Sequence, residues 1–337
     1  MYRIAVDIMS GEKDESELIA GALKALKEDK EIELTLIGEY DIISEELAKT
    51  DYDSKRLKIE NADEIITMDE SPIKALRKKK NATVNVGAAL LKKSEVDAFI
   101  SPGNTGSVMA AGLLRVGRIK GVSRPPIAIQ FPAAEGSTLV LDNGANTDCS
   151  SENLQQFALM GQLYAKNVMK IENPKVALLN IGEEKTKGNN LSKESYQVLS
   201  DDPRIKNFIG NVEGRDIFSD KVDVVVTDGF VGNVVLKTTE GAASFFLDLI
   251  KESFKTNLRS KIAAFLIKPY LKKVLKKIDY RQYGGAPLLG VNGIVIISHG
   301  SSDSTAIYNA VKTAKKTVKE DIVELIKVEL EKNEELE

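Results

Sequence analysis

The sequence predicts an α/β protein built on a mostly parallel sheet. Short runs of β-branched residues alternate along the 337-residue chain with longer segments of helical periodicity, a pattern typical of strands joined by helices. Several runs are almost wholly apolar, as in residues 222–226, which is typical of a strand buried on both faces. No internal repeat or proline-, glycine- or serine-rich linker divides the chain. We therefore expect one domain over residues 1–337 with closely joined lobes, and the softest boundary near residues 150–170.

Each expected strand is a short apolar run that ends at a polar or glycine-containing turn. The expected strands are 2–8, 32–38, 56–60, 96–100, 126–131, 137–141, 175–181, 222–227 and 293–297. Each expected helix is a longer segment in which apolar residues recur every three or four positions. The expected helices are 14–30, 40–49, 72–94, 105–117, 151–169, 191–200, 230–256, 258–278 and 303–333.

The composition excludes several classes of protein. Lys and Arg number 47 against 50 Asp and Glu, a net charge of −3, so a globally basic nucleic-acid-binding protein is disfavoured. No apolar run reaches the ~18 residues of a transmembrane helix, and residues 1–7 enter a strand pattern with no signal peptide before it. The single cysteine, Cys149, and the single histidine, His299, exclude internal disulfides, cysteine-rich zinc sites and multi-histidine metal centres. We expect an intracellular, cytoplasmic protein.

Five expected strands end in turns rich in glycine and small polar residues, and ligands of open α/β sheets bind beyond such strand ends. The turns are 101–107, 142–148, 182–189, 228–233 and 298–303. The first of them opens a helix, where free backbone N–H groups can bind an anion, although an ordinary capped turn has the same residues. The last holds His299, which is either catalytic or structural.

The three middle turns carry side chains whose roles the sequence leaves open. The acids and asparagines of 142–148 suit Mg²⁺, a hydrogen-bonded substrate or an Asx-rich turn. Lys187 suits a phosphate or a solvated charged loop, and Asp228 suits a substrate contact or a helix N-cap. No dinucleotide fingerprint, Walker A, G-x-S-x-G or H-E-x-x-H motif is present. We therefore expect inorganic phosphate or a phosphorylated small molecule as the ligand.

Residues 251–278 form a basic amphipathic segment. Nine basic residues stand there against one acid, Glu252, so the segment carries +8 in a chain of net charge −3. Apolar residues, among them Leu258 and Phe265, recur at helical spacing, and Pro269 predicts a kink or a helix–turn–helix. Such a segment binds an anionic membrane surface or an acidic partner protein. The alternative is a helix packed on the core with a solvated basic face.

In this order, the turns resemble those of the PlsX-type phosphate acyltransferases of bacterial phospholipid synthesis, over about residues 2–330. The matching motifs are 4–7 (I-A-V-D), 101–106 (S-x-G-N-T-G), 117–121 with 124–125, 142–148 (D-x-G-A-N-x-D), 180–188 (N-x-G-x-E-x-x-K-G), 211–213, 224–233 (V-V-V-T-D-G-F-x-G-N), 283–286 (Y-G-G-A) and 298–301 (S-H-G-S). The family usually opens with Met-Gly-Gly-Asp followed by His. Here residues 9–13 are Met-Ser-Gly-Glu-Lys, and we assign no catalytic role to that turn.

The resemblance implies a fold, an activity and partners. The implied fold is a three-layer α/β/α sandwich similar to isocitrate and isopropylmalate dehydrogenases and to phosphotransacetylases, with the basic segment as an amphipathic helical hairpin. The implied reaction converts a long-chain acyl thioester of acyl carrier protein and inorganic phosphate into acyl phosphate and free carrier protein. The resemblance also implies a homodimer with no cofactor, associated peripherally with the membrane. A membrane glycerol-phosphate acyltransferase then uses the product.

The motifs and the chemistry together give the expected site. Phosphate attacks the thioester carbonyl directly, so no protein nucleophile is needed and Cys149 is not expected to act as one. We expect Lys187 to neutralise phosphate or the oxyanion, and His299 to donate to the carbonyl oxygen or protonate the leaving sulfur. Asp228 completes the catalytic set and orients substrate groups. The expected substrate- and phosphate-binding residues are Ser101, Gly103, Asn104, Thr105, Gly106, Asp142, Asn146, Asn180, Glu184, Gly229 and Asn233; no metal ligand is expected.

Other functions remain open at this stage. A phosphotransacetylase-like enzyme would run the same reaction with acyl-CoA, and the basic segment favours the acidic carrier protein over CoA. A membrane-surface scaffold with a degenerate site would explain the altered turn at residues 9–13. A β-decarboxylating dehydrogenase of the same fold would need a cofactor and metal-binding acids that the sequence does not show.

Overall fold

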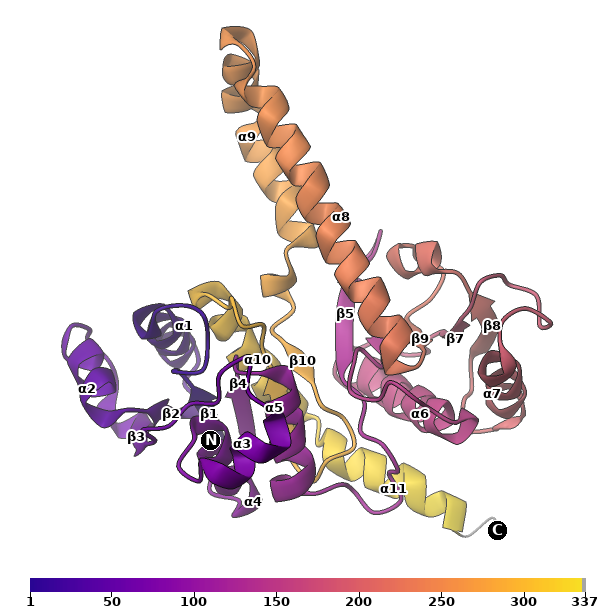
Figure 1. Cartoon of the computed structure of the whole chain (residues 1–337), viewed down its shortest axis with the longest axis horizontal. Coiled ribbons are helices and arrows are strands. Elements are labelled where there is room, and N and C mark those ends of the chain that lie inside the picture. The colour runs from indigo at the N-terminus through magenta and orange to yellow at the C-terminus, as the bar shows by residue number, and fades with distance from the viewer. Residues whose placement is uncertain (335–337) are drawn as a thin grey trace.

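The computed structural model describes the backbone of residues 1–334, and their side chains except those of residues 272–274, 276–278, 280 and 332–334. It contains two sheets with helices packed on them, and a long helical hairpin that extends away from both (Figure 1). All but two of the strand pairs are parallel. The predicted α/β class with mostly parallel strand pairing is therefore confirmed, although the strands are divided between two sheets.

The first sheet has the strand order β10-β11-β4-β1-β2-β3. Its strands are β1 (Tyr2–Asp7), β2 (Ile32–Gly38), β3 (Leu57–Asn61), β4 (Ala98–Ser101), β10 (Ala286–Pro287) and β11 (Ile294–Ile297). Alternate side chains point to opposite faces: Ile4 and Val6 join one apolar cluster and Ala5 joins another. The helices α1 (Glu15–Glu28) and α10 (Ser304–Lys319) cover one face. The other face is covered by α3 (Pro72–Lys78), α4 (Thr83–Lys92) and α5 (Thr105–Ala111). The helix α2 (Tyr40–Ala48) joins β2 to β3.

The second sheet has the strand order β5-β6-β9-β7-β8. Its strands are β5 (Ala128–Pro132), β6 (Ser137–Leu141), β7 (Val176–Leu179), β8 (Phe208–Val212) and β9 (Val224–Val226), with α6 (Ser151–Asn167) and α7 (Asn190–Asp201) packed on them. The sequence did not predict β8, because Gly210 and Asn211 interrupt its apolar run, or β10, which has two residues. Short edge strands give too little periodicity to be recognised.

Three segments expected as single helices are interrupted. The segment 72–94 divides into α3 and α4, and the segment 303–333 divides into α10 and α11 (Ile322–Glu334), where Asp321 adopts φ +48°. The segment 105–117 is α5 followed by a π-helical turn, Gly112–Val116. Apolar periodicity continues across each interruption because both pieces pack on the same core, so the pattern alone does not locate the break.

The two sheets share a core. The chain enters the second sheet after α5 and returns to the first after the hairpin, where β10, β11 and α10 complete it. The helix α11 packs against α6 of the other sheet. One cluster of buried side chains therefore runs through both sheets, from Ile4 and Leu26 to Phe157 and Val226.

The hairpin consists of α8 (Gly229–Lys255) and α9 (Leu258–Ile278), which pack on each other (Figure 1). Asn257 begins α9 by accepting a hydrogen bond from the N–H of Ser260 at 2.9 Å, which is an N-cap. The predicted helix–turn–helix lies at this point, and α9 continues through Pro269. The helical hairpin that the sequence predicted is therefore present, with its turn twelve residues before the proline.

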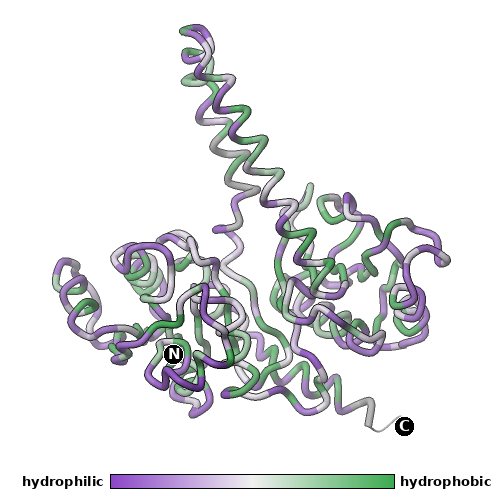
Figure 2. The backbone as a smooth tube through the Cα atoms, viewed as in Figure 1, coloured by the Kyte–Doolittle hydropathy of each residue, from purple (hydrophilic) through white to green (hydrophobic). Residues whose placement is uncertain are grey.

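Most of the hairpin surface is exposed, and much of it is apolar (Figure 2). In α8 only Gly229 and Gly232 are buried. The exposed large apolar side chains include Phe245, Phe246, Leu249, Ile250, Leu258, Ile262, Phe265, Leu266, Ile267 and Tyr270. The alternative of a core-packed helix is therefore wrong for the described part of the hairpin; the side chains of Lys272, Lys273, Lys276 and Lys277 lie outside it. Among the described helices, none combines the length and apolarity needed to cross a bilayer.

Candidate active site

The first group of predicted site residues lies at one edge of the first sheet. β11, β4 and β1 are adjacent and parallel, so the turns after them meet beyond the carboxyl ends of the strands. The N–H of Ser298 donates to the carbonyl of Ser101 at 2.9 Å, and the N–H of Glu12 donates to the carbonyl of Gly300 at 2.8 Å. Since β2 lies on one side of β1 and β4 on the other, this edge is a topological switch point, the usual ligand position in such sheets.

A buried polar network fixes these turns. The Asp7 carboxylate is fully buried at the end of β1, where it accepts from the Ser101 hydroxyl at 2.7 Å and from the Ser10 N–H at 3.2 Å. The Ser10 hydroxyl is 2.7 Å from that of Thr83. Burial raises the pKa of Asp7, an effect that its hydrogen bonds partly offset. Sequence reasoning missed the parts played by Asp7, Ser10 and Thr83, although the position of Asp7 at the end of the first strand was a usable signal.

Asn104 and Thr105 begin α5. The Asn104 side chain accepts from the Ser107 N–H at 3.0 Å and donates to the Met68 carbonyl at 2.9 Å. Asn104 is therefore an N-cap, which was the structural alternative for this turn. The exposed Thr105 begins the first helical turn, and its hydroxyl is the side-chain group that this segment offers to a ligand.

His299 follows β11 at the same edge and is exposed. Its Nδ1 accepts from the N–H of Ser301 at 3.1 Å and lies 2.8 Å from the Ser301 hydroxyl. A neutral imidazole that accepts a backbone N–H at Nδ1 carries its proton on Nε2. The turn thus presents His299 as an Nε2–H donor, the form needed to donate to a carbonyl oxygen or a leaving sulfur.

The second group of predicted residues lies at the corresponding edge of the second sheet, beyond the adjacent parallel strands β6, β9 and β7. Asp142 directly follows β6 and is fully buried. Its carboxylate accepts four hydrogen bonds, from the N–H of Ile127, Ala145 and Asn146 and from the Asn146 side chain, at 2.6 to 3.2 Å. Burial raises the pKa of Asp142 and these donors work against the rise. Asp142 and Asn146 therefore build the turn.

The helix α8 begins directly on this turn. The N–H of Gly229 donates to the Asn146 carbonyl at 2.7 Å, and Asp228 caps α8 by accepting from the Val231 N–H at 2.8 Å. This capping is the structural alternative for Asp228, so its orienting role stays a prediction. The exposed Asn233 lies one helical turn further on, next to Gly144, where its amide can meet a ligand.

The turn after β7 presents Lys187. Asn180 shapes the turn, since its side chain donates to the Lys187 carbonyl at 3.2 Å and accepts from the Ile181 N–H at 2.8 Å. The Asn211 side chain holds the carbonyl of Glu184 at 3.0 Å. Lys187 is exposed, and its ammonium has no carboxylate partner among the residues that the structure describes. The neighbouring Lys185 instead lies over the Tyr196 ring at 5.4 Å.

Cys149 lies beside the second edge, with its thiol 3.4 Å from the Asn146 carbonyl. Burial, together with the charges of Asp142 and Asp228, raises the pKa of the Cys149 thiol to about 11. At neutral pH the nucleophilic thiolate is therefore scarce.

We predict that Cys149→Ala retains at least about half of the wild-type turnover, because a protonated thiol is a poor nucleophile. The measurement is the steady-state rate of both proteins at pH 7, with the unfolding transition followed by circular dichroism. A stably folded variant with no turnover would contradict the assignment.

The structure thus gathers the predicted residues into two groups, one at each sheet edge. Thr105 and His299 in the first, and Lys187 and Asn233 in the second, have exposed polar side chains; most of the others shape the turns. Ala145 of the second group packs against the apolar cluster that contains Val108 of α5. Among the described residues, no cluster of three His, Cys, Asp or Glu side chains is placed to hold a metal ion.

Two mostly parallel sheets, each with a polar edge beyond its strand ends, define an α/β enzyme of the phosphotransacetylase type of fold. A phosphotransacetylase from Streptococcus pyogenes superposes with a TM-score of 0.61 at 16% identity over 95% of this chain and 94% of its own. The EutD phosphotransacetylase from Staphylococcus aureus gives 0.59 at 13% identity over 94% of each chain. These likenesses establish the fold.

The family follows from the sequence comparisons. The model of the fatty acid synthesis protein family matches residues 2–325, and the chain belongs to this family. A phosphate acyltransferase of Halothermothrix orenii is 56% identical over 98% of this chain and 99% of its own length. One from Desulfitobacterium hafniense is 50% identical over 97% of each. The predicted family is confirmed, and the chain is an acyltransferase.

Proposed function

We propose that this protein transfers a long-chain acyl group from the thioester of acyl carrier protein to inorganic phosphate, giving acyl phosphate for phospholipid synthesis. The name of its relatives, phosphate acyltransferase, supports phosphate as the acceptor. Two groups carry the proposal. Beyond one sheet edge lies the Lys187 ammonium, which has no carboxylate partner among the described residues, and beyond the other lies the His299 imidazole with its Nε2–H. The first suits an anionic acceptor and the second a leaving sulfur.

The reaction needs binding and charge stabilisation more than covalent help from the protein. A phosphate oxygen attacks the thioester carbon, the new C–O bond forms, and the carbonyl oxygen takes up negative charge. When the carbonyl re-forms, the C–S bond breaks, and the leaving thiolate accepts a hydrogen bond from the Nε2–H of His299 and takes its proton from solvent. Holding phosphate against the carbonyl lowers such a barrier by ~7–11 kcal/mol in favourable cases.

Each exposed polar group has a place in this sequence of steps. Lys187 neutralises phosphate or the developing oxyanion, where one well-placed donor is worth roughly 3 kcal/mol. Thr105 and Asn233 hydrogen-bond phosphate and the acyl donor. The buried carboxylates Asp7 and Asp142 act indirectly, because they fix the turns from which these groups project.

A second candidate, the same transfer from acyl-CoA, is favoured by the fold shared with phosphotransacetylases. The hairpin supports the carrier protein instead. Its described basic side chains, Lys251, Lys255, Arg259, Lys261 and Lys268, are exposed, and a basic surface attracts an acidic protein partner. The carrier protein is thus the preferred donor.

The exposed apolar side chains of the hairpin complete the proposal. Apolar surface of this extent is covered in a working protein by a second chain or by lipid. We assign the packed length of the hairpin to a homodimer, and its tip, with Leu258, Phe265 and Leu266, to peripheral contact with an anionic membrane. There the product would pass to a membrane glycerol-phosphate acyltransferase.

The test incubates the purified chain with ³²P-phosphate and either acyl carrier thioester or the matching acyl-CoA, and traps acyl phosphate with hydroxylamine. The expected result is labelled acyl phosphate from the carrier thioester, with a kcat/KM at least ~10-fold above that for acyl-CoA, a preference worth about 1.4 kcal/mol. Preference for acyl-CoA supports the second candidate. No product from either donor would overturn both, and a parallel assay with NAD and a hydroxy acid tests the dehydrogenase alternative.

We predict that Leu266→Glu abolishes binding to anionic vesicles and leaves turnover in solution within about twofold, because a carboxylate at the tip opposes both apolar insertion and the anionic surface. The measurement is co-sedimentation with phosphatidylglycerol-containing vesicles. Leu114→Glu is the matched control, since Leu114 is 61% exposed and Leu266 66%, and Leu114 lies outside the hairpin. Equal binding by both variants and the wild type would remove the tip from the membrane contact.

A further inference from the structure

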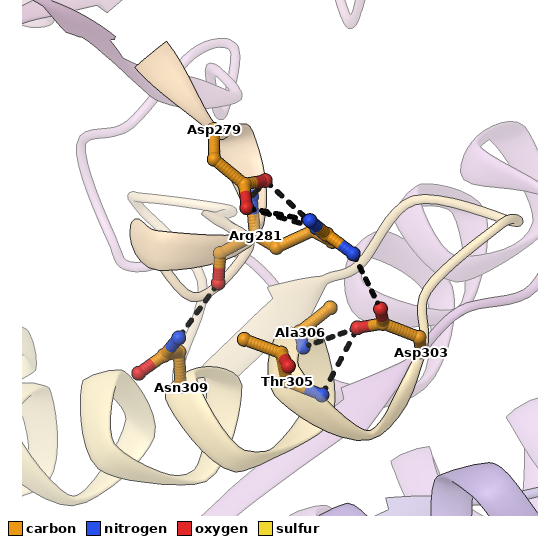
Figure 3. A network of polar contacts seen from close by, with 6 residues as sticks. All are labelled: Asp279, Arg281, Asp303, Thr305, Ala306 and Asn309. Atoms are coloured by element: carbon orange, nitrogen blue, oxygen red, sulfur yellow. Dashed lines mark hydrogen bonds and ion pairs between the residues drawn. The ribbon is translucent and has the colours of Figure 1, made fainter. Parts of the chain in front are cut away.

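The segment that joins the foot of the hairpin to β10 is centred on Arg281 (Figure 3). The Arg281 guanidinium donates three hydrogen bonds to Asp279: from Nε to Oδ1 at 2.8 Å and to Oδ2 at 3.0 Å, and from Nη2 to Oδ2 at 2.7 Å. Its remaining nitrogen, Nη1, donates to Asp303 Oδ2 at 2.7 Å. Asp279 follows the last residue of α9 and Asp303 is the N-cap of α10. One side chain therefore ties the end of the hairpin to the start of a helix that packs on the first sheet.

Asp303 uses its two oxygens for different purposes. Oδ1 accepts from the N–H of Thr305 and of Ala306, both at 3.0 Å, and so caps α10. Oδ2 is left for Arg281. Burial raises the pKa of Asp303, but the helix N–H groups and Arg281 outweigh it, so the pKa is lowered overall. The carboxylate is thus ionised at neutral pH, and its position is fixed from both sides.

The residues between Asp303 and His299 are held in a closed turn by hydrogen bonds. The N–H and the hydroxyl of Ser302 both donate to the His299 carbonyl, at 2.9 and 2.6 Å. The Ser301 N–H binds the imidazole at Nδ1. A five-residue turn closed in this way moves as a unit, so the place of Asp303 sets the orientation of the imidazole.

The same segment also lies flat along α10 and the end of β11. The Arg281 carbonyl accepts from the Asn309 side chain at 2.8 Å (Figure 3), and the Tyr283 carbonyl accepts from the Thr313 hydroxyl at 3.3 Å. Gly284 has φ +73°, and a Cβ there would be 2.4 Å from the Asn309 carbonyl. The motif 283–286, which takes no part in the proposed chemistry, is thus explained by close packing of the segment against α10.

We propose that Arg281 is a positioning residue for acyl transfer: by joining Asp279 at the hairpin foot to Asp303, it holds the His299 imidazole in its donating orientation. The inference rests on the proposed function of His299. Without the guanidinium, Asp279 and Asp303 lose the positive charge that they share, and the two carboxylates repel each other. Asp303 then shifts, and the turn that it anchors shifts with it.

The chain contains a matched control. Asp202 and Arg204 form the same Asp-x-Arg fork, with Nε to Oδ1 at 2.8 Å and Nη2 to Oδ2 at 2.6 Å. This fork lies between α7 and β8, before the strand rather than at its carboxyl end. The Arg204 fork is the more buried of the two, with Arg204 10% and Arg281 42% exposed, so a purely structural role predicts that Arg204→Met destabilises the protein at least as much as Arg281→Met and that neither lowers kcat selectively.

The first measurement is steady-state kinetics. Arg281→Met is expected to lower kcat ~10-fold or more, since a displacement of about 1 Å can reduce a rate by up to 10²-fold, while KM for phosphate and for the donor changes little. Arg204→Met should keep kcat within about twofold. In the His299→Gln background, Arg281→Met should lower kcat no further, because residues that act through one group are not additive. Additive losses, or full activity of His299→Gln, would overturn the inference.

The second measurement does not depend on activity. His299 is the single histidine of the chain, so ¹³C-labelled histidine in the untagged protein gives one imidazole ring signal. Arg281→Met should shift or broaden that signal and Arg204→Met should not; an unmoved signal would overturn the inference.

If Arg281→Met does not fold, Asp303→Asn replaces it, because asparagine retains a capping oxygen and loses the charge that Arg281 binds. If the wild-type protein shows no phosphate-dependent acyl transfer, the proposed function is contradicted. The imidazole ring signal would still report whether Arg281, through Asp303, positions His299.

Discussion

Gly232→Ala is expected to lose measurable acyl transfer and to destabilise the fold by roughly 3 kcal/mol or more, at or beyond the upper end of the effect of overpacking a buried site. Gly232 lies in the first turn of α8, where an added Cβ would be 1.8 Å from the Asp142 carbonyl oxygen. Neither group can yield as a flexible side chain does, because one is a helix backbone and the other belongs to a turn held by four hydrogen bonds.

The matched control is Gly241→Ala in the same helix. Apart from the backbone of the helix itself and the neighbouring residues, no atom of the described residues lies within 4 Å of a Cβ at Gly241. Alanine there should therefore raise the free energy of unfolding by about 0.5–1 kcal/mol through its better helix propensity. The measurements are denaturant unfolding by circular dichroism and the trapped acyl phosphate assay. A Gly232→Ala protein as stable and as active as wild type would show that α8 does not pack on the Asp142 turn.

The second large effect is expected at Lys187. Lys187→Met should lower kcat/KM for phosphate by about 10²-fold, the effect typical of losing one donor that stabilises charge in the transition state. The circular dichroism spectrum should not change, because the Lys187 side chain is exposed and holds no carboxylate among the described residues. The measurement is the initial rate as phosphate is varied at saturating acyl donor.

Lys185→Met is the control for Lys187→Met, since it removes the same charge two residues away. Its ammonium lies over Tyr196, so its loss should leave kcat/KM for phosphate within about threefold, as rim charges contribute little. Equal losses in both variants would mean that the net charge of the turn matters rather than Lys187 itself. An unchanged rate for Lys187→Met would remove it from the site.

The class of the fold could be predicted from the sequence for a physical reason. Buried parallel strands such as Val224–Val226 must be continuous apolar runs, and the turns beyond them carry the glycines and polar side chains of the site. The division into two sheets could not be predicted, because β6 and β4 have the same apolar pattern whichever neighbour they pair with. Pairing is decided by tertiary packing, which a one-dimensional pattern does not contain.

The sequence indicated which turns carry the candidate site residues, but it indicated less well what each of these residues does. Asn104 and Asp228 prove to be helix caps, and the residues that suit a site also suit a cap, since both use a short polar side chain next to free N–H groups. The buried carboxylate of Asp7 was missed because its partner Ser101 is 94 residues away in the sequence. The sequence already singled out Lys187, and the structure adds that the Lys185 ammonium lies over the Tyr196 ring.

The return of the chain to the first sheet after the hairpin has a consequence for biosynthesis. The second sheet is continuous in sequence, from β5 to β9, whereas β11, the neighbour of β4 in the middle of the first sheet, follows almost 300 residues of chain. While the ribosome is still translating, the amino-terminal strands therefore wait with β4 unpaired on one side and the face later covered by α10 open. We expect the middle of the nascent chain to fold ahead of its beginning, and the amino-terminal segment to be the part that chaperones shield until translation ends.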